Sequence, residues 1–290
     1  MNFKHIILTV FVTSFSIGSV ASANTFVTLS KLDANAFSRH SHSQQVLFLA
    51  LDKTVEKYGD YTIVRNEEMS RERSLEQLKK GYLSVHVVPT NEDWENSTIP
   101  VYIPVSKGLL GFRMLLIREE DQSIYSNVND SEQLNLFLAG LGTQWSTTKV
   151  LRHFGYKVVA APDYNGLFKM LSTNRFDYFI RGVNEIFGEF DNIKNDLTNI
   201  KIEDDLVLFI PLPIYIFVSP SQPELAKRIE EGLEMAIDDG SFDKLFNESH
   251  GANLELADLK NRKLIHIGNP LIKDNKNTNN PRYWLNPFDE

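Results

Sequence analysis

Apolar positions in the first third of the chain follow two kinds of spacing. Residues 44–58 and 70–82 repeat apolar side chains every three to four positions, which is the spacing of helices with one buried face. Short apolar runs at 25–29, 61–64 and 84–88 alternate with these helices and are typical of strands. The resulting strand–helix–strand–helix–strand order predicts an open α/β sheet with right-handed crossovers.

Two extended apolar segments interrupt this order. Residues 99–117 contain a bend bracketed by glycines, and residues 205–218 contain prolines that prevent a continuous central strand. We interpret them as the two places where the chain passes between lobes. A helix at 222–237 and a short helix at 242–246 follow the return. The predicted organisation is a lobe 1 of residues 24–107 plus 213–250, a lobe 2 of residues 108–212 with crossovers at both ends, and a C-terminal extension of residues 251–290 that packs on the body.

The first 23 residues have the features of a cleavable secretory signal peptide. Lys4 precedes an apolar run that is too short and too rich in Ser and Thr for a typical membrane span. Ala21-Ser22-Ala23 supplies the small residues for cleavage after Ala23. An uncleaved anchor is the alternative. The chain has no cysteine, which excludes disulfides and a lipid anchor at the cleavage point. We therefore predict a periplasmic protein that is not inserted in the membrane.

The charge balance narrows the range of partners. The signal segment contains one Lys and no acid, so the rest of the chain carries 29 basic and 38 acidic residues. This negative balance argues against nucleic acids and anionic membrane surfaces as partners. It does not exclude an anionic ligand, because a few arginines inside a cleft can outweigh the overall charge.

The most distinctive chemistry lies in the middle of the chain. Residues 138–142 predict a short strand that turns at Gly142 into a helix beginning near Ser146. A helix start exposes unpaired backbone N–H groups, which suit an anion or a polar ligand. A later strand ends at Arg181, whose planar guanidinium fits a carboxylate.

Four segments carry a resemblance to a known family. They are residues 75–81 before a strand, Gly142-Thr143-Gln144, residues 171–177 before a strand, and residues 239–246. In this order the chain resembles a family 3 extracellular solute-binding protein with the type II periplasmic binding fold, over about residues 25–251. The resemblance implies a two-lobed α/β fold, in which each lobe is an open mixed sheet flanked by helices and two hinge strands join the lobes. It also implies that the Gly142 helix start and the Arg181 strand end face the cleft between the lobes.

The sequence departs from this family where its members hold an α-amino acid. Their first-lobe turn carries an Arg for the carboxylate, whereas residues 89–94 contain none. They place an acid for the ammonium group shortly after the R-F-D strand, whereas Arg181 stands near that place here. The chain therefore resembles divergent transporter-substrate-binding members. Its implied ligand is small and polar, acidic or zwitterionic, but not an ordinary amino acid.

The candidate ligand-binding residues combine the pattern with the resemblance. Arg181 is the principal candidate cation, and a solvated strand end or an interlobe salt bridge is its structural alternative. Asn184 and Glu185 open the next helix, where both could serve only as caps. Trp145 is either a wall of the site or a packed helix residue. The complete set is Arg71, Thr90, Glu92, Trp94, Arg113, Gly142, Thr143, Gln144, Trp145, Ser146, Arg181, Asn184 and Glu185.

The sequence contains no motif for catalysis or for a phosphate-binding loop. His40 and His42 have no nearby carboxylate or cysteine, so we do not interpret them as a metal site. We expect a monomeric binding protein without enzymatic activity, cofactor or metal. It would capture a small molecule and deliver it to an inner-membrane transporter. The alternative is a ligand-binding regulatory partner of a membrane sensor.

Overall fold

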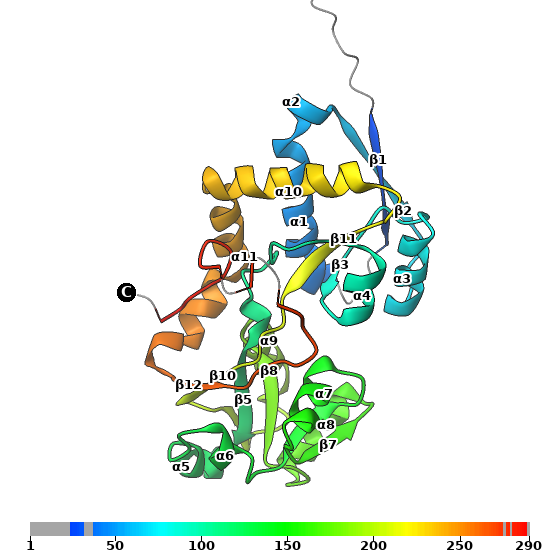
Figure 1. Cartoon of the computed structure of the whole chain (residues 1–290). Helices are drawn as coiled ribbons and strands as arrows, with labels where there is room; N and C mark the ends of the chain where they lie inside the picture. Colours follow the sequence, from blue (N-terminus) through cyan, green and yellow to red (C-terminus); the bar gives the residue numbers. More distant parts are fainter. Residues whose placement is uncertain (1–23, 32–36, 275–276, 279, 289–290) are drawn as a thin grey trace, which may run out of the picture.

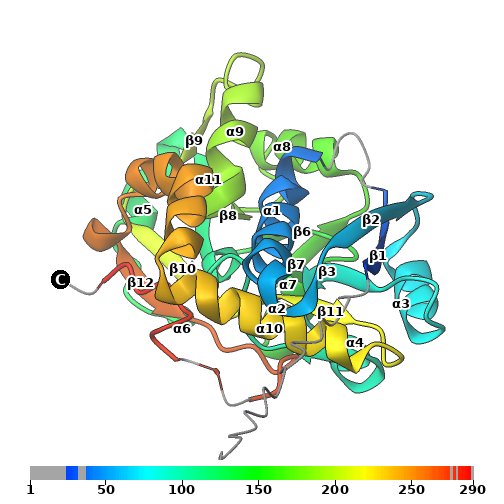
Figure 2. The ribbon, with the colours of Figure 1, turned by 90° about the horizontal axis from the view of Figure 1, so that it is seen from above.

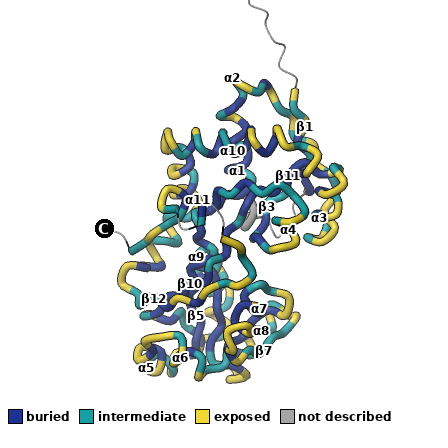
Figure 3. The backbone as a smooth tube through the Cα atoms, viewed as in Figure 1, coloured by how far each residue is buried: buried dark blue, intermediate teal, exposed yellow. Residues whose placement is uncertain are grey.

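The computed structural model describes residues 24–31, 37–274, 277–278 and 280–288. The predicted signal peptide lies outside these residues. Two groups of strands and helices lie one above the other (Figure 1), and each group has its own buried interior (Figure 3). No helix in the described ranges is long and apolar enough to cross a lipid bilayer.

Five strands belong to the first lobe. They are β1 (Thr25–Ser30), β2 (Tyr61–Asn66), β3 (Val85–Pro89), β4 (Ile99–Val101) and β11 (Ile214–Val218). β1 and β2 pair in parallel, whereas β11 lies antiparallel between β3 and β4. The Ser84 N–H donates to the Thr28 carbonyl (2.9 Å) and links the two sheets. The helices of this lobe are α1 (Phe37–Lys53), α2 (Val55–Tyr58), α3 (Arg71–Lys79), α4 (Glu92–Ser97) and α10 (Pro223–Asp238).

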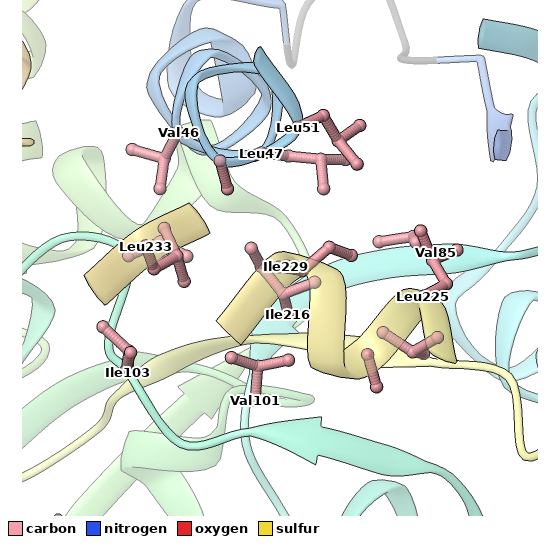
Figure 4. Packing of buried hydrophobic residues seen from close by; sticks show 14 of the residues in the cluster. Val46, Leu47, Leu51, Val85, Val101, Ile103, Ile216, Leu225, Ile229 and Leu233 are labelled. Atoms are coloured by element: carbon pink, nitrogen blue, oxygen red, sulfur yellow. The ribbon is translucent and has the colours of Figure 1, made fainter. Parts of the chain in front are cut away.

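Helices α1 and α10 pack together over the strands because each carries an apolar stripe. Val46, Leu47 and Leu51 of α1 lie across from Ile229 and Leu233 of α10 (Figure 4). All five side chains are fully buried, and each contributes roughly 1.5–3 kcal/mol relative to exposure. The helical spacing predicted α10 within one residue at each end. It also predicted a helix at 44–58, but α1 begins earlier, at Phe37, and Thr54 separates it from α2.

The second lobe is a seven-stranded mixed sheet in the order β12-β10-β5-β8-β6-β7, with β9 paired to β5. Its strands are β5 (Phe112–Arg118), β6 (Ala139–Gly142), β7 (Val158–Ala161), β8 (Tyr178–Gly182), β9 (Ile200–Ile202), β10 (Leu206–Phe209) and β12 (Lys263–His266). Its helices are α5 (Gln122–Tyr125), α6 (Ser131–Leu134), α7 (Ser146–His153), α8 (Tyr164–Ser172) and α9 (Val183–Ile193). The predicted strand before Gly142 and the predicted strand ending at Arg181 are confirmed as β6 and β8.

The two crossings between the lobes lie side by side. The Val105 N–H donates to the Ile214 carbonyl (3.0 Å), and the Ile210 N–H donates to the Gly111 carbonyl (2.9 Å). The 3-10 turn η1 (Leu109–Gly111) leads from the first crossing into β5. As predicted, the two prolines of the second crossing separate β10 from β11.

The C-terminal region differs from the sequence prediction in two respects. The helix expected at 242–246 is α11 (Ser241–Ala257), which is far longer because it packs against α1, α9 and α10 (Figure 2). After the turn η3 (Leu259–Asn261), β12 joins the edge of the lobe 2 sheet, parallel to β10. Within the predicted extension, residues 251–257 therefore belong to α11 and residues 263–266 form an edge strand of that sheet.

The segment after β12 lies against both crossings. Its polar contacts onto crossing carbonyls are Asn269 Nδ2 to Pro211 (2.7 Å), Asn277 Nδ2 to Tyr102 (2.8 Å) and Leu285 N–H to Lys107 (2.8 Å). The Trp284 ring covers Gly108, whose φ is +73°; a Cβ there would lie 2.3 Å from the ring. Glycine is required at this position by both the backbone conformation and the close approach.

Candidate functional site

A cavity of about 480 Å³ lies between the lobes, beside both crossings. Lobe 1 contributes α3 and the end of β3, the crossings contribute two leucines, and lobe 2 contributes β5, β8 and the starts of α7, α8 and α9. The lining residues are Arg71, Pro89, Leu110, Arg113, Gln144, Trp145, Ser146, Thr147, Tyr164, Arg181, Glu185 and Leu212. A space of this size suits a small organic molecule.

The cavity contains about half of the predicted ligand-binding residues. Those that line it are Arg71, Arg113, Gln144, Trp145, Ser146, Arg181 and Glu185. Arg113 and Arg181 are far apart in sequence, but the antiparallel pairing of β5 with β8 places Met114 opposite Arg181 and Arg113 opposite Gly182. The predicted residues outside the cavity lining are Thr90, Glu92, Trp94, Gly142, Thr143 and Asn184.

Arg181 lies on the cavity wall, but its guanidinium is already occupied. Its Nε and Nη2 each donate to a carboxylate oxygen of Glu189 at 2.5 Å, and Nη2 is 3.2 Å from Glu185 Oε2. The guanidinium carbon is 4.6 Å from the centre of the Trp145 ring. Burial lowers the pKa of Arg181, but the Glu189 hydrogen bonds and the acidic charges raise it by more. Arg181 therefore forms a salt bridge within lobe 2, and not the interlobe salt bridge or the solvated strand end considered above. This salt bridge leaves Arg181 poorly placed to bind a ligand.

Arg113 is a second arginine on the cavity wall, and it lacks the hydrogen bonds that hold Arg181. It is only 6% exposed, yet its guanidinium makes no hydrogen bond to any residue that the structure describes, and its Nε is buried without a partner. Its closest carboxylate oxygen is Glu185 Oε2, 3.7 Å from Nη1. Burial, reinforced by the charge of Arg181, lowers the pKa of Arg113 to about 10. Buried polar groups in proteins are rarely left unsatisfied, so this guanidinium requires an explanation.

Arg71 is the cation on the lobe 1 side. It occupies the first position of α3, where the helix dipole disfavours a positive charge. Its Nη2 donates to the Pro89 carbonyl, and its Nε is buried with no partner among the described residues. Desolvation lowers its pKa. Arg71 is therefore a second guanidinium in this cavity with hydrogen-bond donors that are only partly satisfied.

The start of α7 supplies backbone donors. Trp145 is the N-cap residue and its side chain makes no cap hydrogen bond. In the described part of the chain, the N–H groups of Ser146 and Thr147 have no acceptor, as expected at the first turn of a helix. Gly142 shapes the site indirectly, because a Cβ there would lie 2.4 Å from the Trp145 ring. Thr143 is exposed and its N–H donates to the Ala161 carbonyl.

Glu185 is both a cap and a cavity residue. Its Oε2 accepts from the Gly182 N–H at the start of α9 (3.0 Å) and lies between the guanidinium groups of Arg113 and Arg181. Gly182 makes this arrangement possible, because a Cβ there would lie 3.0 Å from Glu185 Oε2 and 2.8 Å from Asn184 Oδ1. Asn184 itself does not line the cavity.

The three candidates of the predicted first-lobe turn, Thr90, Glu92 and Trp94, lie outside the cavity lining. Trp94 is 2% exposed and stacks on His86 within the core. The Thr90 hydroxyl donates to Glu95, and Glu92 is an exposed partner of Lys273 (3.2 Å). These three side chains therefore contact other parts of the protein and do not line the interlobe cavity.

Two important residues were not predicted. Glu189 holds Arg181, and Tyr164 lines the cavity beside it. Burial and the neighbouring Glu189 carboxylate raise the pKa of the Tyr164 hydroxyl. The available signal for Glu189 was its spacing, since Glu185 and Glu189 are four residues apart and share one face of a helix.

The histidines form a separate cluster near the first crossing. His42 Nε2 is 2.9 Å from the Val105 carbonyl, Nδ1 is 2.9 Å from Ser249 Oγ, and the His42 and His250 rings are 4.5 Å apart. The side chain of His40 lies outside the described residues. The described residues contain no group of His, Cys, Asp and Glu side chains that could hold a metal ion.

No protein-family model matches the sequence, and no curated protein matches it. Several solved structures do match this chain. The ligand-binding core of GluR0 from Nostoc punctiforme, in complex with L-glutamate, is 13% identical with a TM-score of 0.51, over 77% of this chain and 98% of that one. The VFT2 domain of BvgS from Bordetella pertussis is 17% identical with a TM-score of 0.53, over 77% and 92%.

A third similar structure comes from work on glutathione import via GshT and the cystine ABC importer TcyBC of Streptococcus mutans. It is 14% identical with a TM-score of 0.51, over 79% of this chain and 96% of that one. At these identities the similarity concerns the fold. The chain has the two-lobed α/β fold of type II periplasmic binding proteins, as the resemblance implied.

Proposed function

We propose that this protein is a periplasmic solute-binding protein that captures a small polar ligand between its lobes. The observation that carries the proposal is Arg113, a buried guanidinium on the wall of an interlobe cavity without a hydrogen bond to any described residue. A ligand anion would satisfy it with charge-assisted hydrogen bonds, each contributing roughly 1.5–3 kcal/mol. Arg71, from the opposite lobe, would add further hydrogen bonds to the ligand when the lobes close.

The two crossings would act as the hinge, with lobe boundaries near residues 107 and 213. Closure would bring Arg71 toward the α7 start and bury the ligand. We propose binding without chemical conversion, and delivery to an inner-membrane transporter. Among the similar folds are a histidine kinase sensor domain and the BvgS domain, so presentation of the ligand to a membrane sensor is the alternative.

Native mass spectrometry of the exported protein, purified without denaturation, tests the proposal. We expect a population heavier than the mature chain by the mass of one small molecule. Arg113→Met should lose this population, and Arg73→Gln, which changes an exposed residue on the same helix as Arg71, should keep it. A wild-type protein that carries no solute, and whose melting temperature no periplasmic extract raises, would refute the binding function.

A further inference from the structure

The donors and acceptors of the cavity are strongly unbalanced. Three arginines line it, namely Arg71, Arg113 and Arg181, against the single lining carboxylate of Glu185. The first two have a buried Nε without a partner in the described chain. The first turn of α7 adds the N–H groups of Ser146 and Thr147. Arg71, Arg113 and these two N–H groups can therefore donate hydrogen bonds to an anion, whereas Arg181 is already held by Glu189.

The carboxylates that could pair with a ligand ammonium, and the Pro89 carbonyl, are already engaged. Glu185 Oε2 receives the Gly182 N–H and lies 3.2 Å from Arg181. Glu189, behind the wall, accepts both fork hydrogen bonds of Arg181. On the lobe 1 side the Pro89 carbonyl accepts from Arg71. Even with both glutamates counted against the three arginines, the cavity keeps an excess positive charge.

We propose that the ligand is a small organic acid that carries no ammonium group, such as a dicarboxylate or a hydroxy acid. This inference rests on the proposed function, because it names the class of solute for the same cavity. A ligand ammonium would add a positive charge beside under-neutralised arginines and would lack an unengaged carboxylate. A hydroxyl at the same carbon carries no such penalty, because neutral polar side chains such as Gln144, Ser146 and Tyr164 also line the cavity.

The apolar part of the wall argues for an organic rather than an inorganic anion. Leu110 and Leu212 of the crossings and the ring of Trp145 line the same space. A cavity of about 480 Å³ is much larger than phosphate or sulfate would fill. Carbon atoms of the acid would contact these side chains, while its carboxylate would contact the arginines.

Calorimetric titration with matched ligands tests the class. Succinate, malate and aspartate differ only in whether one carbon bears hydrogen, hydroxyl or ammonium, and glutarate, 2-hydroxyglutarate and glutamate repeat the comparison. In at least one series we expect the plain or the hydroxy acid to bind at least tenfold more tightly than the amino acid. Arg71→Gln should weaken that binding at least tenfold, whereas Arg73→Gln should leave it unchanged.

Two results would overturn the inference. One is an amino acid that binds as tightly as its deaminated partner in both series. The other is a protein that binds none of the six acids. In either case, a cavity-bound solute found by native mass spectrometry, and lost in Arg113→Met, would leave the proposed binding function intact. The absence of any such solute would instead count against the function itself.

Discussion

Replacing Arg113 by methionine should stabilise the empty protein while abolishing ligand binding. Burial lowers the pKa of Arg113 from 12.5 to about 10. At about 1.4 kcal/mol for each pKa unit, the charged guanidinium costs the folded state about 3 kcal/mol at neutral pH. A cation with a lowered pKa destabilises the folded state throughout the range below that pKa. Methionine retains most of the apolar stem and removes the charge, so we expect a net gain of about 1–3 kcal/mol.

The neighbouring acid does not lose its support in this variant. Glu185 still receives the Gly182 N–H and still lies 3.2 Å from Arg181. No buried carboxylate is therefore left alone, which is the usual reason why removing one member of a buried pair is harmful. The gain should appear as a higher urea midpoint with an unchanged slope, measured on protein freed of ligand.

Arg118 provides the matched control on the same strand. It is also buried, at 7% exposure, but its Nη1 donates to the carbonyls of Leu171 (3.3 Å) and Phe176 (2.8 Å), and its Nη2 pairs with Asp121 (2.6 Å). Arg118→Met should therefore cost about 3–5 kcal/mol. If Arg113→Met destabilises the protein as much as Arg118→Met, or if it keeps the ligand, the reasoning about Arg113 fails.

Three further substitutions, one of them with a matched control, have defined outcomes. Gly182→Ala should push Glu185 from its cap and cost about 1–2 kcal/mol, whereas Gly188→Ala, an open helical position, should gain about 0.5–1 kcal/mol in the same urea assay. Burial lowers the pKa of His250 from 6.5 to about 4. The folded state therefore keeps its full stability at this site above pH 6.5 and loses stability as the pH falls toward 4, because the unfolded chain takes up the proton first. Wild type should thus lose up to about 3 kcal/mol more than His250→Phe between pH 7 and 4. Trp284→Ala should lower the free energy of unfolding by about 2–3 kcal/mol, and so lower the urea midpoint, because its ring covers the first crossing. An unchanged midpoint would mean that the C-terminal segment does not stabilise the crossings.

Local sequence patterns predicted individual helices and strands better than they predicted which elements pack or pair with one another. The helical spacing at 222–237 and the prolines between the last two crossing strands are local signals, and both predictions are confirmed. α11 extends to Ala257, although Gly251 lies inside it. Glycine lowers helix propensity, and packing against three other helices overrides this preference. β12 joins the lobe 2 sheet through parallel pairing with β10, which no local pattern encodes.

The ligand site was also predicted only as far as local patterns reach. The sequence placed Arg181 at the end of a strand, and the structure places it on the cavity wall. Its engagement by Glu189 depends on how α9 leaves Gly182 and folds back beside β8, a geometry that residue types do not specify. Arg113 was one candidate among several, because strand alternation alone does not say which face of β5 meets the cavity. The pairing of β5 with β8 sets Arg113 opposite Gly182, one position along from Arg181, and both arginines line the cavity.

Arg113 of β5 and Arg181 of β8 have different roles in the cavity wall. Arg181 is neutralised by Glu189 and packs on Trp145, so it fixes the shape of the site. Arg113 remains charged, buried and without a hydrogen bond to any described residue, so it destabilises the empty protein and gains most from an anion. Stability and affinity are therefore opposed at this residue, which is typical of binding sites. The C-terminal segment offsets part of that cost, because it adds hydrogen bonds and Trp284 to the crossings next to the cavity.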